Sequence, residues 1–262
     1  MVDGQAIFDA HARADTLARS DLENLAFFGV KALVTSAHDG VCGGKAEDLE
    51  LHFESLVRST VQGVRATGIA CYVALGIPAS KIPWHGLEFL VSGLPRWLDM
   101  PEVVAISGVG LFRGGAREEE VLRLQCDIAR QLRFPLVAMA PERDRERMLR
   151  RMLAILQESK LPKEDVLIAR AMEQEVSVAR ALGYSATLGA LDPDAAADLV
   201  LRLGPEGLIL SSDIGEGRVD PLLPERFVRA MHGRGLSRGV IRRVAFANAA
   251  NFFRVQPEVG SG

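Results

Sequence analysis

The chain has 262 residues, of which 48% are hydrophobic and 25% are charged, and its formal net charge is -3. This composition is that of an ordinary globular protein, and the charge gives no electrostatic reason to expect a nucleic acid or a membrane surface as partner. The N-terminus lacks the basic start of a secretory signal, and the longest uncharged stretch, residues 66–80, is too short for a membrane helix. The three scattered cysteines favour a reducing, cytoplasmic location over a disulfide framework.

Short apolar segments alternate with longer helical patterns along the first half of the chain. Strands are predicted at 6–12, 30–38, 69–77 and 103–112, and helices at 20–29, about 45–68, 87–98 and 117–132. The first helix starts with a candidate capping box, formed by Ser20 and Glu23, and stops at Gly29.

The second half repeats this alternation. Strands are predicted at 134–141, 166–171, 184–190 and 207–215, and helices at 143–159, 173–183, 192–204, 224–235 and 237–253. Asp192 has the residue type of an N-cap, and Pro193 suits the first helical position.

These eight strand–helix units predict an α/β fold. Strands that are apolar throughout and are each followed by a helix indicate a parallel sheet with a covered outer face, and eight units at this length fit a (β/α)₈ TIM barrel. A doubly wound open sheet is the structural alternative. No linker divides the chain, so we expect one domain over residues 1–255 and a loose tail at 256–262.

Polar residues at the ends of the predicted strands mark the expected site, because chemistry in this barrel sits at the carboxyl ends of the strands. The polar candidates are Asp9, His11, Arg13, Asp15, Ser36, His38, Asp39, Ser107, Arg113, Arg170, Glu173, Thr187, Ser211, Ser212, Asp213 and Glu216. The fourth and fifth strand ends also carry Gly108 and Met139. His52, His85 and His232 fall in loop or helix patterns and are expected at the surface.

The order of these motifs resembles the TatD-like metal-dependent hydrolases of the amidohydrolase superfamily. The segments "LGIPASKIP", "VVAISGVGL", "FPLVAMAP", "LILSSDIGEGRVDPL" and "VAFANAANFFRV" are similar to family stretches in the same order. The resemblance covers almost the whole chain and implies the barrel fold. It also implies a dinuclear metal site, held by His-x-His on the first strand, a carboxylate on the fourth, histidines on the fifth and sixth, and an aspartate on the last.

Most of those implied ligands are replaced here. His11 and Asp213 are kept, but Arg13, Gly108, Met139 and Arg170 stand at the other positions. Arginine has no electron pair to donate, and two ligands are too few for a hydrolytic zinc or manganese site. We therefore expect no metal cofactor, with a single divalent ion on His11, Asp213 and either Asp9 or Asp15 as the alternative.

The two arginines suggest a replacement for the metals. A guanidinium binds a carboxylate or phosphate in a bidentate fork, so Arg13 and Arg170 are predicted to bind an anionic small molecule. The remaining candidates for this ligand site are Asp9, Asp15, His38, Glu173 and Glu216. Alternatively, the arginines neutralise Asp9 and Asp213, because buried charges are usually paired.

Three functions remain open at this point. The first is a pseudoenzyme or accessory protein that binds an anionic small molecule, with a protein partner possible. The second is an active ester, phosphoester or amide hydrolase with a mononuclear or metal-free site, in which His11 and Asp213 are catalytic. The third is a nuclease, which is least favoured because no basic groove is evident.

Overall fold

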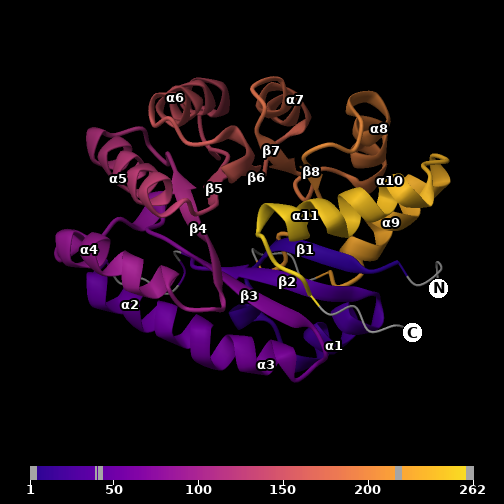
Figure 1. Ribbon diagram of the computed structural model, residues 1–262, viewed down its shortest axis with the longest axis horizontal. Coiled ribbons are helices and arrows are strands. Elements are labelled where there is room, and N and C mark those ends of the chain that lie inside the picture. Colours follow the sequence, from indigo (N-terminus) through magenta and orange to yellow (C-terminus); the bar gives the residue numbers. More distant parts are fainter. Residues whose placement is uncertain (1–4, 39, 41–43, 216–219, 258–262) are drawn as a thin grey trace.

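The computed structural model describes residues 5–38, 40, 44–215 and 220–257. Eight strands pair in parallel in the order of the sequence, and helices lie around the outside of these strands (Figure 1). The strands are β1 Ile7–Ala12, β2 Val30–Ser36, β3 Ala70–Leu75, β4 Val103–Gly110, β5 Leu136–Met139, β6 Val166–Ala169, β7 Ser185–Thr187 and β8 Leu208–Ile209. The predicted (β/α)₈ barrel is confirmed, and the open-sheet alternative is wrong.

The last strand closes against the first through residues beyond its own short length. The backbone N–H of Ala10 donates to the carbonyl of Leu210 at 3.1 Å. The N–H of Asp213 donates to the carbonyl of His11 at 3.1 Å. These bonds place the ends of the first and last strand segments side by side, as the barrel interpretation requires.

The helices follow the predicted alternation. They are α1 Arg19–Phe27, α2 Ala46–Ser55, α3 Val61–Arg65, α4 Leu87–Leu98, α5 Ala116–Leu132, α6 Arg145–Glu158, α7 Glu173–Ala181, α8 Pro193–Leu203, α9 Leu223–Gly233, α10 Arg238–Arg242 and α11 Asn248–Phe252. The predicted cap of α8 is confirmed, since the Asp192 carboxylate accepts the N–H of Asp194 at 2.9 Å. No helix among the described residues is long and apolar enough to cross a membrane.

The predicted capping box of α1 is wrong. Helix α1 begins at Arg19, so Ser20 already lies in the first turn. The extended residue before the helix is Ala18, and its N–H donates to the carboxylate of Asp21 at 3.2 Å. Asp21 therefore takes the part that the sequence pattern assigned to Glu23, because the helix starts earlier than the pattern indicates.

An aromatic cluster fills the amino-terminal part of the barrel interior. The ring of Phe8, at the start of β1, lies 6.1 Å from Tyr72, 5.8 Å from Phe246 and 5.9 Å from Phe253, measured between ring centroids. Phe253 follows α11, so the end of the described chain packs against this end of the barrel (Figure 1). The barrel interior is thus filled by aromatic side chains at the amino-terminal ends of the strands, and the polar residues gather at the carboxyl ends.

Candidate functional site

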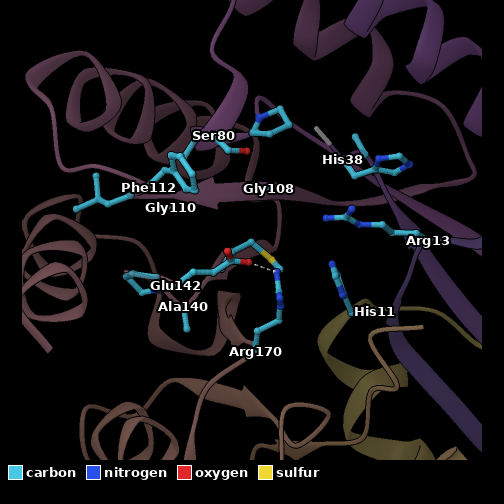
Figure 2. Close-up of a pocket in the computed structure, with 16 residues that line it drawn as sticks. His11, Arg13, His38, Ser80, Gly108, Gly110, Phe112, Ala140, Glu142 and Arg170 are labelled. Carbon is cyan, nitrogen blue, oxygen red and sulfur yellow. Dashed lines mark ion pairs between the residues drawn. The ribbon is translucent and has the colours of Figure 1, made fainter. Parts of the chain in front are cut away.

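A cavity of about 110 Å³ opens at the carboxyl ends of the strands. Figure 2 shows side chains from several strand ends pointing into it. The residues that line it include His11, Arg13, His38, Pro78, Ser80, Gly108, Phe112, Met139, Glu142 and Arg170. The structure therefore brings six of the residues singled out at the strand ends, His11, Arg13, His38, Gly108, Met139 and Arg170, to one cavity.

His11 and Asp213 form a buried pair across the closure of the barrel. The Nδ1 atom of His11 lies 2.9 Å from Oδ1 of Asp213, and the two residues are 3% and 5% exposed. With the carboxylate ionised, Nδ1 carries the proton that is donated to Asp213, so in the neutral ring the lone pair lies on Nε2. The pair has the form of a base and the group that orients it.

Asp9 does not line the cavity. It lies between Phe8 and Ala10, which belong to the packed barrel interior, so strand alternation turns its side chain to the other face. There its carboxylate accepts the backbone N–H of Ser212 at 2.9 Å and also the hydroxyl of Ser212. Burial raises the pKa of Asp9 from 3.8 to about 6, against the lowering effect of these hydrogen bonds. Asp9 fastens the first strand to the last.

His38 is held by hydrogen bonds at both ring nitrogens. The N–H of Gly40 donates to Nδ1 at 3.1 Å, so the proton of the neutral ring lies on Nε2 and is donated to Asp15 at 2.8 Å. Burial opposes ionisation of Asp15, but the hydrogen bond from His38 and the charges of His38 and His52 lower its pKa overall. Asp15 thus accepts the proton of Nε2 and orients the ring of His38.

His52 lies next to His38 and is buried, so the prediction that it lies at the surface is wrong. Its ring lies edge-on to that of His38, with centroids 4.7 Å apart, and it is 6% exposed because it lies on the face of α2 that packs against the barrel. Burial, together with the electrostatic influence of the neighbouring His38, lowers the pKa of His52 to about 4. His52 is therefore neutral at pH 7.

Arg13 and Arg170 reach the cavity from two separate strand ends. Their guanidinium groups both point toward its centre (Figure 2). The N–H of Arg13 donates to the carbonyl of Ile214 at 2.9 Å. Arg170 has a left-handed backbone, with a φ of 59°, and its N–H donates to the Thr187 hydroxyl at 3.1 Å.

A carboxylate accompanies Arg170 in the cavity wall. The Nη1 atom of Arg170 lies 2.9 Å from Oε1 of Glu142, whose side chain is 54% exposed. On the other side, Arg145 donates to the carbonyl of Arg170 at 3.1 Å and is itself paired with Glu175 at 2.6 Å. These contacts fix the backbone of Arg170, while its head group has a partner that solvent also reaches. Among the described residues, the ion pair recorded for Arg170 is the one with Glu142, and the carboxylate of Asp213 is bonded to His11.

The donor set does not fit the two-metal centre that the resemblance implies. Met139 and the two arginines line the cavity where histidine ligands would be required. Gly108 has a φ of 75°, and a Cβ atom there would lie 3.4 Å from the Cα of Pro78, so this backbone disfavours any side chain. His11 and Asp213 are the family ligands that remain.

A separate group with metal-binding donor types is formed by Asp15, His38 and His52. One ligand atom from each lies within 4.8 Å of the others, and Oδ1 of Asp15 has no hydrogen-bond partner among the described residues. However, Nε2 of His38 already carries the proton donated to Asp15, and the N–H of His38 reaches Nε2 of His52 at 3.4 Å. This group would fit a single ion only after the bond between His38 and Asp15 opens.

One predicted candidate, Glu173, is not among the residues that line the cavity. Glu173 begins α7, away from the cavity, and its carboxylate pairs with Arg202 at 2.8 Å. Asp39 and Glu216 lie outside the described residues. Glu142, Ser80 and Phe112 also line the cavity, although no sequence pattern singled them out. Two sequence signals could have identified two of them. Phe112 is the last residue of the predicted fourth strand, and Glu142 directly follows the predicted fifth strand.

No family model matches the chain. An uncharacterized metal-dependent hydrolase of Methanocaldococcus jannaschii is 28% identical over 253 residues, which are 95% of this chain and 100% of that protein. A TatD-like protein from Archaeoglobus fulgidus has a similar structure, with a TM-score of 0.80 and 24% identity over 95% of this chain and 100% of that one. A phosphotriesterase homology protein from Escherichia coli, crystallised with phosphate in its active site, gives a TM-score of 0.70 at 17% identity over 96% and 99% of the two chains.

Proposed function

Because the chain resembles the TatD-like metal-dependent hydrolases in sequence and fold, we propose that it is a barrel of this kind in which two arginines have replaced the metals as the anion-binding element. The function that follows is the binding of a small molecule with a carboxylate or phosphate group between Arg13 and Arg170. The observation that carries the proposal is that both guanidinium groups line one cavity at the carboxyl ends of the strands.

The chemistry of the wall supports an anionic ligand. A guanidinium keeps its charge at all working pH values and offers paired donors that match carboxylate and phosphate oxygens. Glu142 is more than half exposed, so an incoming anion can take its place on Arg170 while the carboxylate turns to solvent. A role as a pseudoenzyme or accessory protein follows if no reaction accompanies binding.

A second candidate function is metal-independent hydrolysis, favoured by the buried pair of His11 and Asp213 beside the same arginines. In this scheme Nε2 of His11 takes a proton from a water molecule that attacks the ester carbonyl, while the arginines hold the anionic part of the substrate. The acyl C–O bond then breaks, and the protonated ring returns the proton to the leaving alkoxide, which departs as the alcohol. Asp213 keeps the ring in the required tautomer and stabilises its positive charge. Asp213→Asn would abolish ester hydrolysis and leave anion binding in place.

The proposed function is tested by titrating chelator-treated protein with inorganic phosphate and with acetate in a calorimeter. Arg170→Lys keeps the charge but loses the bidentate fork, and we expect it to weaken phosphate binding about tenfold. Arg13→Lys should have the same effect. Arg150→Ala, on the exposed face of α6, is the matched control. Equal phosphate affinity in all four proteins, or no binding by the wild type, would overturn the proposal.

A further inference from the structure

A second group of positive charges lies at the rim of the cavity, next to Phe112. The guanidinium carbon of Arg113 lies 5.8 Å from the centroid of the Phe112 ring, and that of Arg143 lies 5.3 Å from it. Both distances fall within the range of a cation–π interaction. Phe112 itself lines the cavity, so the aromatic ring that forms part of the wall also has two guanidinium groups over it.

The segment that carries Phe112 and Arg113 is fixed by one carboxylate. Glu118, in the first turn of α5, accepts the N–H groups of Phe112 at 2.7 Å, Arg113 at 2.9 Å and Gly114 at 2.9 Å. The aromatic wall and the start of the Arg113 side chain are therefore held in place before any ligand arrives.

The chain links the rim to the inner arginines. Glu142 pairs with Arg170 in the cavity, and the next residue, Arg143, lies over Phe112 at the rim. Of two successive residues after β5, Glu142 thus contacts an inner arginine, and Arg143 is one of the two outer arginines. The side chain that pairs with Arg170 and one of the two outer arginines are therefore carried by neighbouring residues of the same loop.

The outer arginines differ from their neighbours in having no acidic partner. Within residues 5–38, 40, 44–215 and 220–257, no carboxylate lies within ion-pair distance of Arg113 or Arg143. The arginines of the nearby helix α6 each have a carboxylate partner: Arg145 pairs with Glu175, Arg147 with Asp144, Arg150 with Glu146 and Arg151 with Glu119. Two guanidinium groups over one ring, with no ion pair to a carboxylate in the described part of the chain, are suited to a negatively charged group.

We propose that Arg113 and Arg143 form a second anion subsite at the rim, and that the ligand of this barrel is therefore a small molecule with two anionic groups. This inference rests on the proposed function, because the inner group of the ligand is the one held by Arg13 and Arg170. The part of the ligand between its two anionic groups passes Phe112, so an apolar spacer suits it.

The test compares ligands with one and two charged ends. Straight-chain dicarboxylates from succinate to suberate, and the monocarboxylates of the same lengths, are titrated into chelator-treated protein. The double variant Arg113→Ala/Arg143→Ala removes the outer cations. The matched control is Arg147→Ala/Arg150→Ala, which removes the same charge from exposed arginines of the neighbouring helix.

We expect one dicarboxylate length to bind wild type about tenfold more tightly than its monocarboxylate. The Arg113→Ala/Arg143→Ala protein should lose this advantage and bind monocarboxylates as wild type does, and the control should keep the advantage. Equal affinity of wild type for both ligand classes, or equal losses in the two double variants, would overturn the second subsite alone. Failure of wild type to bind either class would overturn the proposed function and the subsite together.

Discussion

Replacement of Asp9 by asparagine should remove a pH dependence from the stability of the barrel. Asp9 is completely buried, and burial raises its pKa from 3.8 to about 6. The folded state therefore holds the proton more tightly than the unfolded state. As the pH rises from about 4 to about 6, the unfolded chain loses this proton first, and the free energy of unfolding falls.

The size of the effect follows from the same two pKa values. A tenfold change in a proton-binding constant corresponds to about 1.4 kcal/mol, so the rise from 3.8 to about 6 corresponds to about 3 kcal/mol. The asparagine side chain of the variant would not titrate, and its amide can still accept from the Ser212 backbone and donate to the Ser212 hydroxyl. The difference in unfolding free energy, wild type minus Asp9→Asn, should fall by about this amount between pH 4 and pH 7.

Urea unfolding followed by circular dichroism at several pH values measures this difference. Comparison with the variant cancels the contributions of other shifted groups, among them Asp15 and His52. Asp15, with its lowered pKa, contributes stability that is lost as the pH falls, which is the opposite sign. A difference that stays constant from pH 4 to pH 7 would refute the reasoning, because Asp9 would then titrate alike in both states.

Two further substitutions probe the packing around Asp213 and the wall of the cavity. Gly189→Ala should destabilise the fold by about 2 kcal/mol, because the added Cβ would lie 2.4 Å from the Ser211 hydroxyl and 2.7 Å from Oδ2 of Asp213. Urea unfolding measures this loss of stability. Gly63→Ala is the control, because a Cβ at Gly63 meets nothing within 4 Å. Gly108→Glu puts a carboxylate back at the fourth-strand ligand position, but the left-handed φ of 75° should cost about 1–2 kcal/mol and prevent metal binding. Metal analysis after zinc loading would contradict this if the variant bound one ion per chain that wild type does not.

The fold could be predicted from the sequence because each strand–helix unit carries its own apolar pattern. The cap at Asp192 depends on residues that are neighbours in the chain, and it was predicted correctly. The start of α1 was placed too late. Ser20 has the residue type of an N-cap, whereas the residue that precedes the helix is Ala18, whose extended backbone conformation the sequence does not reveal.

The site was only partly predictable for a different reason. His11, Arg13 and Arg170 were found as residues that end strands. Asp9 could not be separated from them, since the parallel pairing of β1 is irregular between Asp9 and Ala12 and this irregularity changes which side chains face the cavity. Glu142 enters through its contact with Arg170, which no local pattern shows.

The burial of His52 likewise depends on tertiary packing. Helical spacing alone does not tell which side of α2 faces the barrel at this point, and the contact with His38 decides it. Residues of this kind become visible only when two elements are placed together.

A crystal structure of the protein grown with zinc and phosphate, with anomalous diffraction data, tests the central claim most directly. The account predicts phosphate oxygens within hydrogen-bond distance of both Arg13 and Arg170, and no anomalous peak between His11 and Asp213. A coordinated zinc ion bound by His11 and Asp213, with phosphate on the metal and away from the arginines, would contradict it.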